Sequence, residues 1–383
     1  PPHAFVIEDA LPPHVSGSSR RSHATPSAPS RSSESGSRGG RPWAAMLPRL
    51  PAPQHGTPHR LLYSLGRVGL IVTLAAALWF ASTATGGLQV FGKTLAAWNP
   101  IGQHAQPDSW MWGVQVPRDR LLVYYHIPYA PWGYLGAYTD TPHGDDQLLA
   151  RIAAQSQAYA KLDPRHPVVS ALDIVSPVAQ ADPQPDGSYT AFTPDSVVEH
   201  YYQLATRHHM LFFLDVQPGR MPLDTIVTRL WKWLQLPNVH LALDAEFDVA
   251  PDGVPDQDLG VMHASEINEV VARLANLVAS KHLPHKIVIL HQWSAPSLPD
   301  WHDVRTNPDV AIVTCADGFG TPGMKLDKYD VFDHQRLIQY AGIKLFYPNW
   351  PGQREDHPLL DHPLMAPADV LKLQPPPTLV MYQ

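Results

Sequence analysis

The sequence predicts an α/β fold, a (β/α)8 TIM-like barrel. Eight short apolar runs follow one another between Leu121 and Gln383, and helix-like stretches separate them. Turn residues flank each run, and four to seven β-branched, aromatic or leucyl residues fill it, which is typical of a buried parallel strand. The runs are LLVYYHIPY from Leu121, VVSALDIVS from Val168, LFFLDVQPG from Leu211, VHLALDAEF from Val239, KIVILHQW from Lys286, VAIVTCADGFG from Val310, IKLFYPNW from Ile343 and TLVMYQ from Thr378.

Helices are predicted between the runs from their caps and their apolar spacing. The clearest is the segment from His263 to Pro284, where apolar residues recur at three and four positions, Ser265 is a candidate cap and the proline ends the helix. Three earlier helices are expected in DDQLLARIAAQSQAYAKL after Gly144, in TPDSVVEHYYQLATRH from Thr193 and in PLDTIVTRLWKWLQ from Pro222.

Polar residues end most of the apolar runs. Barrels of this type carry their active sites at the carboxyl ends of the strands, so we expect these side chains to gather there. They are His126, Asp173, Asp215, Gln217, Asp244, Glu246, His291, Gln292, Asp317, Asn349 and Tyr382.

The third and fourth runs end in LDVQ and LDAE, the most specific pattern in the chain. Residues two apart in a strand point the same way, so Asp244 and Glu246 are expected to share one face, beside Asp215 and Gln217 of the neighbouring strand. Two carboxyls this close do not both ionise readily, and the one that keeps its proton is suited to general acid catalysis. The alternative is a structural layer of ion pairs.

Two lysines are candidate partners in that alternative, Lys344 and Lys325. A lysine ammonium between the acids would neutralise them without any catalytic role. The catalytic interpretation is favoured because residues at the carboxyl end of a barrel serve chemistry more often than stability.

The Asp-Ala-Glu that ends the fourth run resembles the Asp-x-Glu of family-18 chitinases and Chalaropsis-type lysozymes. The resemblance implies that Glu246 is the proton donor and that Asp244 supports it. This chain has Ala242 where the chitinases carry a further Asp, and His126 where the lysozymes carry an early Asp. The segments LDVQPGR, LALDAEF, DGFG, KLFY and the terminal YQ also resemble an uncharacterised family of bacterial exported or membrane-anchored proteins.

Aromatic residues near the same strand ends suit a glycan cleft, because sugar rings stack on aromatic faces while polar side chains bind the hydroxyls. Packing in the core explains some of these aromatic residues equally well. We therefore expect catalysis by Glu246, Asp244, Asp215 and Asp317, and substrate binding by His126, Asp173, Gln217, His291, Gln292, Trp293, Tyr347, Asn349 and Tyr382.

The predicted function is a membrane-anchored, glycoside-hydrolase-like protein that acts on an envelope or environmental glycan. A non-catalytic barrel that binds a glycan or a protein is the first alternative, and a metal-dependent hydrolase that uses His126 and His291 with strand-end acids is the second. The sequence contains no phosphate-binding loop, dinucleotide fingerprint or nucleophile elbow, so we expect no cofactor. The single cysteine, Cys315, lies in a predicted core strand, which excludes a thiolate metal cluster and a disulfide framework.

The first 92 residues predict a tail and a membrane anchor. Residues 1–60 are rich in Pro, Ser, Gly and Arg and are expected to be disordered. Residues 61–92 are expected to form a transmembrane signal-anchor, because the stretch 68–92 is uncharged, apolar and long enough to span a lipid bilayer. A cleaved signal peptide with a small-residue site at residues 81–84 is the alternative.

The charge distribution predicts the orientation and limits the partners. Eight arginines precede the apolar stretch and Lys93 alone follows it closely, so the barrel is expected to be extracytoplasmic on a single-pass protein. Residues 93–120 are expected to form a stalk that ends against the barrel domain, residues 121–383. Beyond residue 67 the chain has 20 basic and 32 acidic residues, a net charge of −12, which excludes nucleic acid as a partner.

Overall fold

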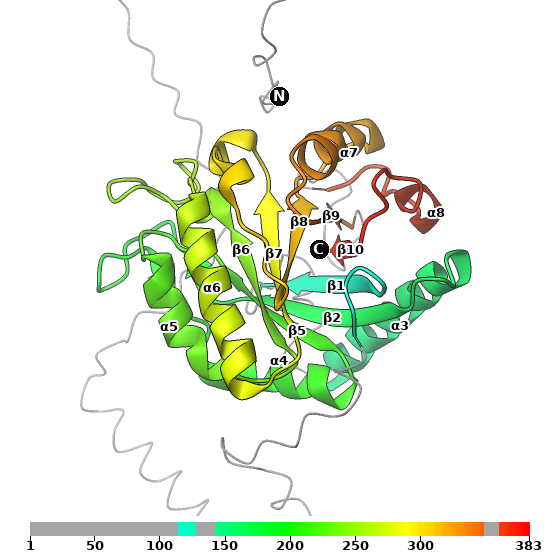
Figure 1. Ribbon diagram of the computed structural model, residues 1–383, viewed down its shortest axis with the longest axis horizontal. Helices are drawn as coiled ribbons and strands as arrows, with labels where there is room; N and C mark the ends of the chain where they lie inside the picture. Colours follow the sequence, from blue (N-terminus) through cyan, green and yellow to red (C-terminus); the bar gives the residue numbers. More distant parts are fainter. Residues whose placement is uncertain (1–113, 128–141, 348–359) are drawn as a thin grey trace, which may run out of the picture. The chain divides into compact units, whose positions relative to one another are not determined.

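A computed structural model describes residues 114–127, 142–347 and 360–383 of the chain (Figure 1). The predicted tail, the predicted membrane anchor, most of the predicted stalk and Asn349 lie outside the described residues. Of the helices within those ranges, none is long and apolar enough to cross a membrane.

Eight parallel strands close into a barrel in the order β1-β10-β9-β8-β7-β6-β5-β2. Each strand overlaps one of the predicted apolar runs, so the predicted barrel is confirmed, although β9 begins three residues before its run. The strands are β1 (Arg120–His126), β2 (Val168–Val175), β5 (Leu211–Val216), β6 (Val239–Asp244), β7 (Lys286–Gln292), β8 (Val310–Ala316), β9 (Tyr340–Leu345) and β10 (Leu379–Tyr382). A small hairpin of β3 (Val178–Ala179) and β4 (Thr190–Ala191) extends the loop after β2.

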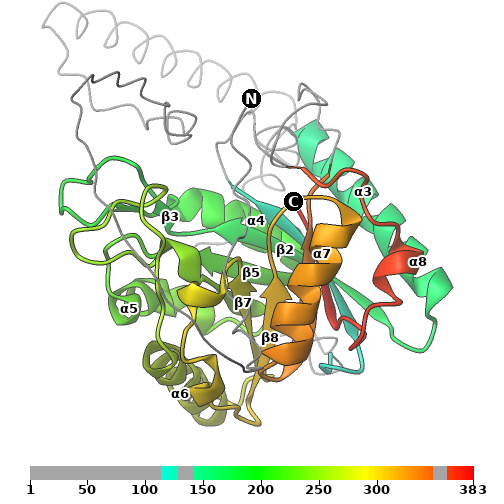
Figure 2. The ribbon, with the colours of Figure 1, turned by 90° about the horizontal axis from the view of Figure 1, so that it is seen from above.

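Helices cover the outside of the barrel (Figures 1 and 2). They are α3 (Pro142–Leu162), α4 (Asp195–Arg207), α5 (Leu223–Leu234), α6 (Ala264–Lys281), α7 (Pro322–Tyr329), a π-helical turn at Asp330–Gln335, and α8 (Pro367–Val370). The connection between β7 and β8 has two 3₁₀ turns, Ala295–Ser297 and Trp301–Asp303, in place of an α-helix. Pro296, Pro299 and Pro308 lie in this connection and explain the interruption, because proline breaks helical hydrogen bonding.

The helix predicted from His263 begins one residue after that histidine, and the suggested cap Ser265 is wrong. His263 itself is the N-cap, and its backbone N–H donates to the Glu266 side chain at 2.9 Å in a capping box. The helix ends at Lys281, because His282 adopts a left-handed backbone with φ of 52°.

Alternation along each strand separates two apolar clusters. On β5, Phe213 packs inside the barrel, whereas Phe212 and Leu214 pack against the surrounding helices. Val114, from the end of the predicted stalk, joins the interior cluster. Burial on both faces explains why the strands are almost continuously apolar.

The strand register stacks the inward side chains in layers, each supplied by alternate strands, as in other barrels of this fold. Near the carboxyl end, the lower layer has Asp173, Ala242, Cys315 and Met381, the middle layer has Tyr125, Asp215, His291 and Lys344, and the upper layer has Val175, Asp244, Asp317 and Gln383. The interior side chains of the barrel therefore change from apolar to charged toward the carboxyl ends of the strands. We call this end of the barrel the mouth.

Candidate active site

Five carboxyl groups gather in and above these layers. We call Asp173, Asp215, Asp244, Asp317 and Glu246 the acid cluster. The four aspartates are at most 4% exposed, and Glu246 is half-buried. Among the described residues, Lys344 and His291 are the basic side chains that lie in these layers with them. Buried charged side chains destabilise a protein unless each is paired with an opposite charge or a hydrogen-bonding group.

His291 and Lys344 hold Asp317 as a carboxylate. One Asp317 oxygen lies 2.9 Å from His291 Nδ1 and accepts a hydrogen bond from Lys344 Nζ at 3.0 Å. Burial alone would raise the pKa of Asp317, but Lys344 and His291 together lower it well below its usual range. Lys344 Nζ also lies 3.8 Å from the centre of the Tyr125 ring, a cation–π contact that fixes its position.

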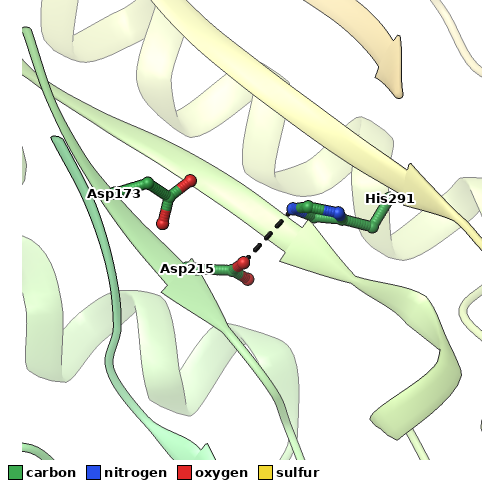
Figure 3. A group of neighbouring side chains, drawn as sticks. All are labelled: Asp173, Asp215 and His291. Atoms are coloured by element: carbon green, nitrogen blue, oxygen red, sulfur yellow. Dashed lines mark ion pairs between the residues drawn. The ribbon is translucent and has the colours of Figure 1, made fainter. Parts of the chain in front are cut away.

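Asp215 and Asp173 lie on the other side of His291, and Figure 3 shows the three side chains converging from β2, β5 and β7. Asp215 Oδ2 lies 3.2 Å from His291 Nε2, without the alignment of a hydrogen bond. Within the described part of the chain, neither oxygen of either aspartate has a hydrogen-bond partner. Burial, with a further contribution from Asp215, raises the pKa of Asp173 well above its usual range.

Glu246 does not continue the strand, so the prediction that it shares a strand face with Asp244 is wrong. β6 ends at Asp244, and Glu246 lies in a 3₁₀ turn, Ala245–Phe247, above the upper layer. Two glycines hold this turn: Gly260 N–H donates to the Glu246 carbonyl at 2.7 Å, and Gly219 N–H donates to the Phe247 carbonyl at 2.9 Å.

Both glycines are required by close approach. A Cβ on Gly260 would lie 2.3 Å from the Asp248 nitrogen, and Gly219 has φ of 63° with a carbonyl oxygen 2.6 Å from its Cβ position. The backbone on each side of Glu246 is thus fixed, and its carboxyl makes no hydrogen bond to the residues that the structure describes. Burial, Asp244 and Asp317 raise the pKa of Glu246 well above its usual range.

Asp244 lies directly below this turn and is 3% exposed. Burial, with a further contribution from Asp215 and against the opposing effect of His291, raises the pKa of Asp244 to about 7. The two lysines considered as counter-charges for the acids pair with other carboxyls. Lys344 donates to Asp317 rather than to Asp244, and Lys325 Nζ lies 3.6 Å from Asp361.

An aromatic edge lies beside the acid cluster. The half-buried rings of Trp293 and Phe319 are 5.4 Å apart, and Lys328 Nζ lies 3.8 Å from the centre of the Trp293 ring. Gly318 of the DGFG segment is required by this packing, because its φ is 108° and a Cβ there would lie 2.3 Å from Lys328 Nζ and 2.9 Å from the Trp293 ring. Gln217 lies nearby, where its amide donates to the Tyr125 hydroxyl at 3.4 Å and accepts from Ala179 N–H at 3.2 Å.

Four predicted substrate-binding residues lie on the outer face of the strands, away from the acid cluster. His126 Nε2 lies 3.1 Å from the Tyr201 hydroxyl on α4, and the Gln292 amide donates to the His291 carbonyl. Tyr382 stacks on Tyr347, with ring centres 5.0 Å apart, between β10 and α3. The proposed metal pair of His126 and His291 is therefore separated by the wall of the barrel.

The Tyr382 hydroxyl makes a structural contribution that can be measured. It accepts a hydrogen bond from Gln155 at 2.7 Å and lies 2.9 Å from the Tyr159 hydroxyl. Tyr382→Phe leaves the buried Tyr159 hydroxyl and the half-buried Gln155 amide without this partner, so the free energy of unfolding is expected to fall by about 1–3 kcal/mol in urea denaturation. Tyr340→Phe, whose hydroxyl forms no hydrogen bond to the described residues, is the control and should change it by less than about 0.5 kcal/mol.

Comparisons with protein-family models, with curated proteins and with solved structures each found no match for this chain. The barrel and its mouth are therefore interpreted from their own chemistry. The resemblance of the Asp-Ala-Glu segment to chitinases and lysozymes stays a prediction.

Proposed function

We propose that this chain is a glycoside hydrolase in which Glu246 donates a proton to the glycosidic oxygen. The observation that carries the proposal is the position of Glu246, which a fixed turn holds above the acid cluster and whose half-buried carboxyl has no hydrogen-bond partner in the described part of the chain. A general acid must keep its proton near neutral pH and must reach the substrate, and this position supports both requirements.

Asp317 is the proposed second carboxylate. Asp215 and Asp317 were both candidates, and Asp317 lies in the layer nearer the mouth, where Lys344 and His291 keep it ionised. Cleavage of a glycosidic bond needs one protonated and one ionised carboxyl, the first to protonate the leaving oxygen and the second to act as base or nucleophile. Asp244, below Glu246, raises the pKa of the donor when Asp244 is ionised, and this helps Glu246 to keep its proton.

The aromatic edge supports a sugar as the substrate. Trp293 and Phe319 are half-buried aromatic residues beside the acids, and a pyranose ring stacks on aromatic rings that reach the surface. The predicted single-pass anchor and the extracytoplasmic orientation place an envelope or environmental glycan within reach of the barrel, and this location remains part of the proposal.

The direct test is hydrolysis of a panel of cell-wall and chitin-like oligosaccharides by the full-length chain. We expect new reducing ends with at least one member of the panel, and NMR of the first products assigns the anomer and therefore the mechanism. Tight binding of an oligosaccharide without any turnover would replace the proposal by the non-catalytic binding barrel. A chain that neither binds nor cleaves any member would remove the glycan from the proposal.

A further inference from the structure

We propose that Asp173, Asp215 and His291 form a buried site for one divalent transition-metal cation, with Zn²⁺ as the best fit. The three residues come from β2, β5 and β7 and lie in the lower and middle layers, beneath the acids of the mouth (Figure 3). This inference goes beyond the proposed hydrolase activity and does not depend on it.

The geometry of the three groups fits a small ion. One ligand atom from each residue can be chosen so that all lie within 4.8 Å of one another. His291 Nε2 and Asp215 Oδ2 are 3.2 Å apart. Two ligand atoms at Zn²⁺ bond lengths of about 2.0 Å in a tetrahedron are separated by ~3.3 Å, so this pair already spans one edge of a coordination shell.

The polar atoms of the site lack other partners. Asp173 and Asp215 are each 0% exposed, and within the described residues neither carboxylate accepts a hydrogen bond. His291 Nε2 also lacks a hydrogen bond there. Buried polar atoms are nearly always satisfied. Asp173 has no hydrogen-bond or ion-pair partner among the described residues, and the ion pair of Asp215 there is with the same imidazole, so the arrangement indicates a missing cation.

Asp317 prepares His291 to bind that cation. The Asp317 carboxylate lies 2.9 Å from Nδ1 of His291, and Lys344 holds the same carboxylate at 3.0 Å. A carboxylate that accepts from one imidazole nitrogen orients the ring and leaves the other nitrogen as the ligand, which is the usual support of a histidine that binds a metal. The other nitrogen here is Nε2, which lies 3.2 Å from Asp215 Oδ2.

The donor set selects among cations. Carboxylate oxygens suit Mg²⁺, Ca²⁺ and Mn²⁺, whereas an imidazole nitrogen favours Zn²⁺ and its transition-metal neighbours. The cation would also balance charge inside the barrel. Lys344 is the one lysine among the described residues of these layers, and its charge interacts with four buried aspartates. A divalent cation would balance Asp173 and Asp215, which form no ion pair with Lys344 among the described residues, whereas Asp317 does.

The test is a titration of Zn²⁺ into the full-length chain after removal of metals with EDTA. We expect about one Zn²⁺ per chain by calorimetry and by elemental analysis. At a free concentration 100 times the dissociation constant, the melting temperature is expected to rise by about 5–10 °C. Mg²⁺ at the same concentration is expected to give a much smaller rise, and an equal rise would overturn the mixed nitrogen and oxygen site.

Variants locate the site. Asp173→Asn and His291→Gln are each expected to weaken Zn²⁺ binding by at least about 10-fold, since even groups behind metal ligands change affinity 10- to 100-fold. His126→Gln is the matched control, because His126 is as buried as His291 but faces α4, and its Zn²⁺ affinity should equal that of the unmodified chain.

Folding of the variants is checked without metal. Asp173→Asn keeps the shape of the side chain and removes an unpartnered ionisable group, so its metal-free melting temperature is expected to be no lower than that of the unmodified chain. No Zn²⁺ binding by the unmodified chain, or unchanged affinity in both site variants, overturns the proposal. Neither outcome uses glycan turnover, so this test and the test of the hydrolase remain separate.

Discussion

Glu246→Gln is expected to lower the rate of glycan hydrolysis by about 10²- to 10⁴-fold, the usual contribution of general acid catalysis. Gln keeps the size of the side chain and cannot donate the acidic proton. The turn around Glu246 is held by backbone hydrogen bonds from Gly219 and Gly260, so the fold should survive the change. The measurement is turnover on the best substrate of the panel, together with the melting temperature of both proteins.

The pH profile gives this prediction a second readout. Because burial, Asp244 and Asp317 raise the pKa of Glu246, the unmodified chain should lose activity as the pH rises through that raised value, where the donor loses its proton. Lys344 and His291 oppose this increase in the pKa of Glu246. Lys328 adds a further positive charge near Glu246. The residual activity of the Gln variant should lack this alkaline limb.

Glu269→Gln is the matched control, because Glu269 is exposed on α6, and it should keep the activity of the unmodified chain. Equal turnover in the Glu246 and Glu269 variants would remove Glu246 from the mechanism.

The barrel was predictable because its signal is repeated. Few folds other than a barrel fit eight apolar runs that are separated by helix-length segments, and each run overlaps a strand. The connection after β7 was harder, because Pro296 and Pro299 end helices without indicating what replaces them, and the 3₁₀ turns there depend on tertiary packing. The hairpin of β3 and β4 is two residues deep on each side, too short to leave a periodic pattern.

The acid cluster was predictable residue by residue, whereas the lining of the mouth was not. On β1 and β7, Tyr125 and His291 point inward, so their neighbours His126 and Gln292 point outward. Successive side chains of a strand always point to opposite faces. A strand that is buried on both faces is apolar on both, however, so the sequence does not show which of its side chains point into the barrel. Tyr382 was assigned to the wrong face for the same reason.

The role of Lys344 can be read from the sequence once the inward face of β9 is known. Lys344 lies at an inward position of β9, in the same layer as Asp215 and His291, and it became a candidate only as a structural counter-charge. The structure pairs it with Asp317, through which it also positions His291. One residue thus serves the charge balance of the core and the arrangement of the site.

Lys344→Met is accordingly expected to lower the free energy of unfolding by about 3–5 kcal/mol, the usual cost of removing one partner from a buried ion pair. Lys344 is 3% exposed, and its loss leaves Asp317 beside Asp244 and Asp215 with His291 as the remaining basic contact among the described residues. Urea denaturation measures the change. Adding Asp317→Asn should recover about 0.5–3 kcal/mol, because the second change removes the charge that the first left unpaired.

The control for this prediction is another buried lysine. Lys286 is 0% exposed, but its ammonium donates only to the carbonyls of Leu236 and Val239, at 2.6 and 2.8 Å. Lys286→Met therefore leaves no carboxylate unpaired, and we expect a loss of about 1–2 kcal/mol for two hydrogen bonds. Equal losses in the two methionine variants would mean that burial of a lysine, rather than neutralisation of the acid cluster, sets the cost. A larger loss for Lys344→Met that Asp317→Asn partly reverses is the result that charge balance in the barrel requires.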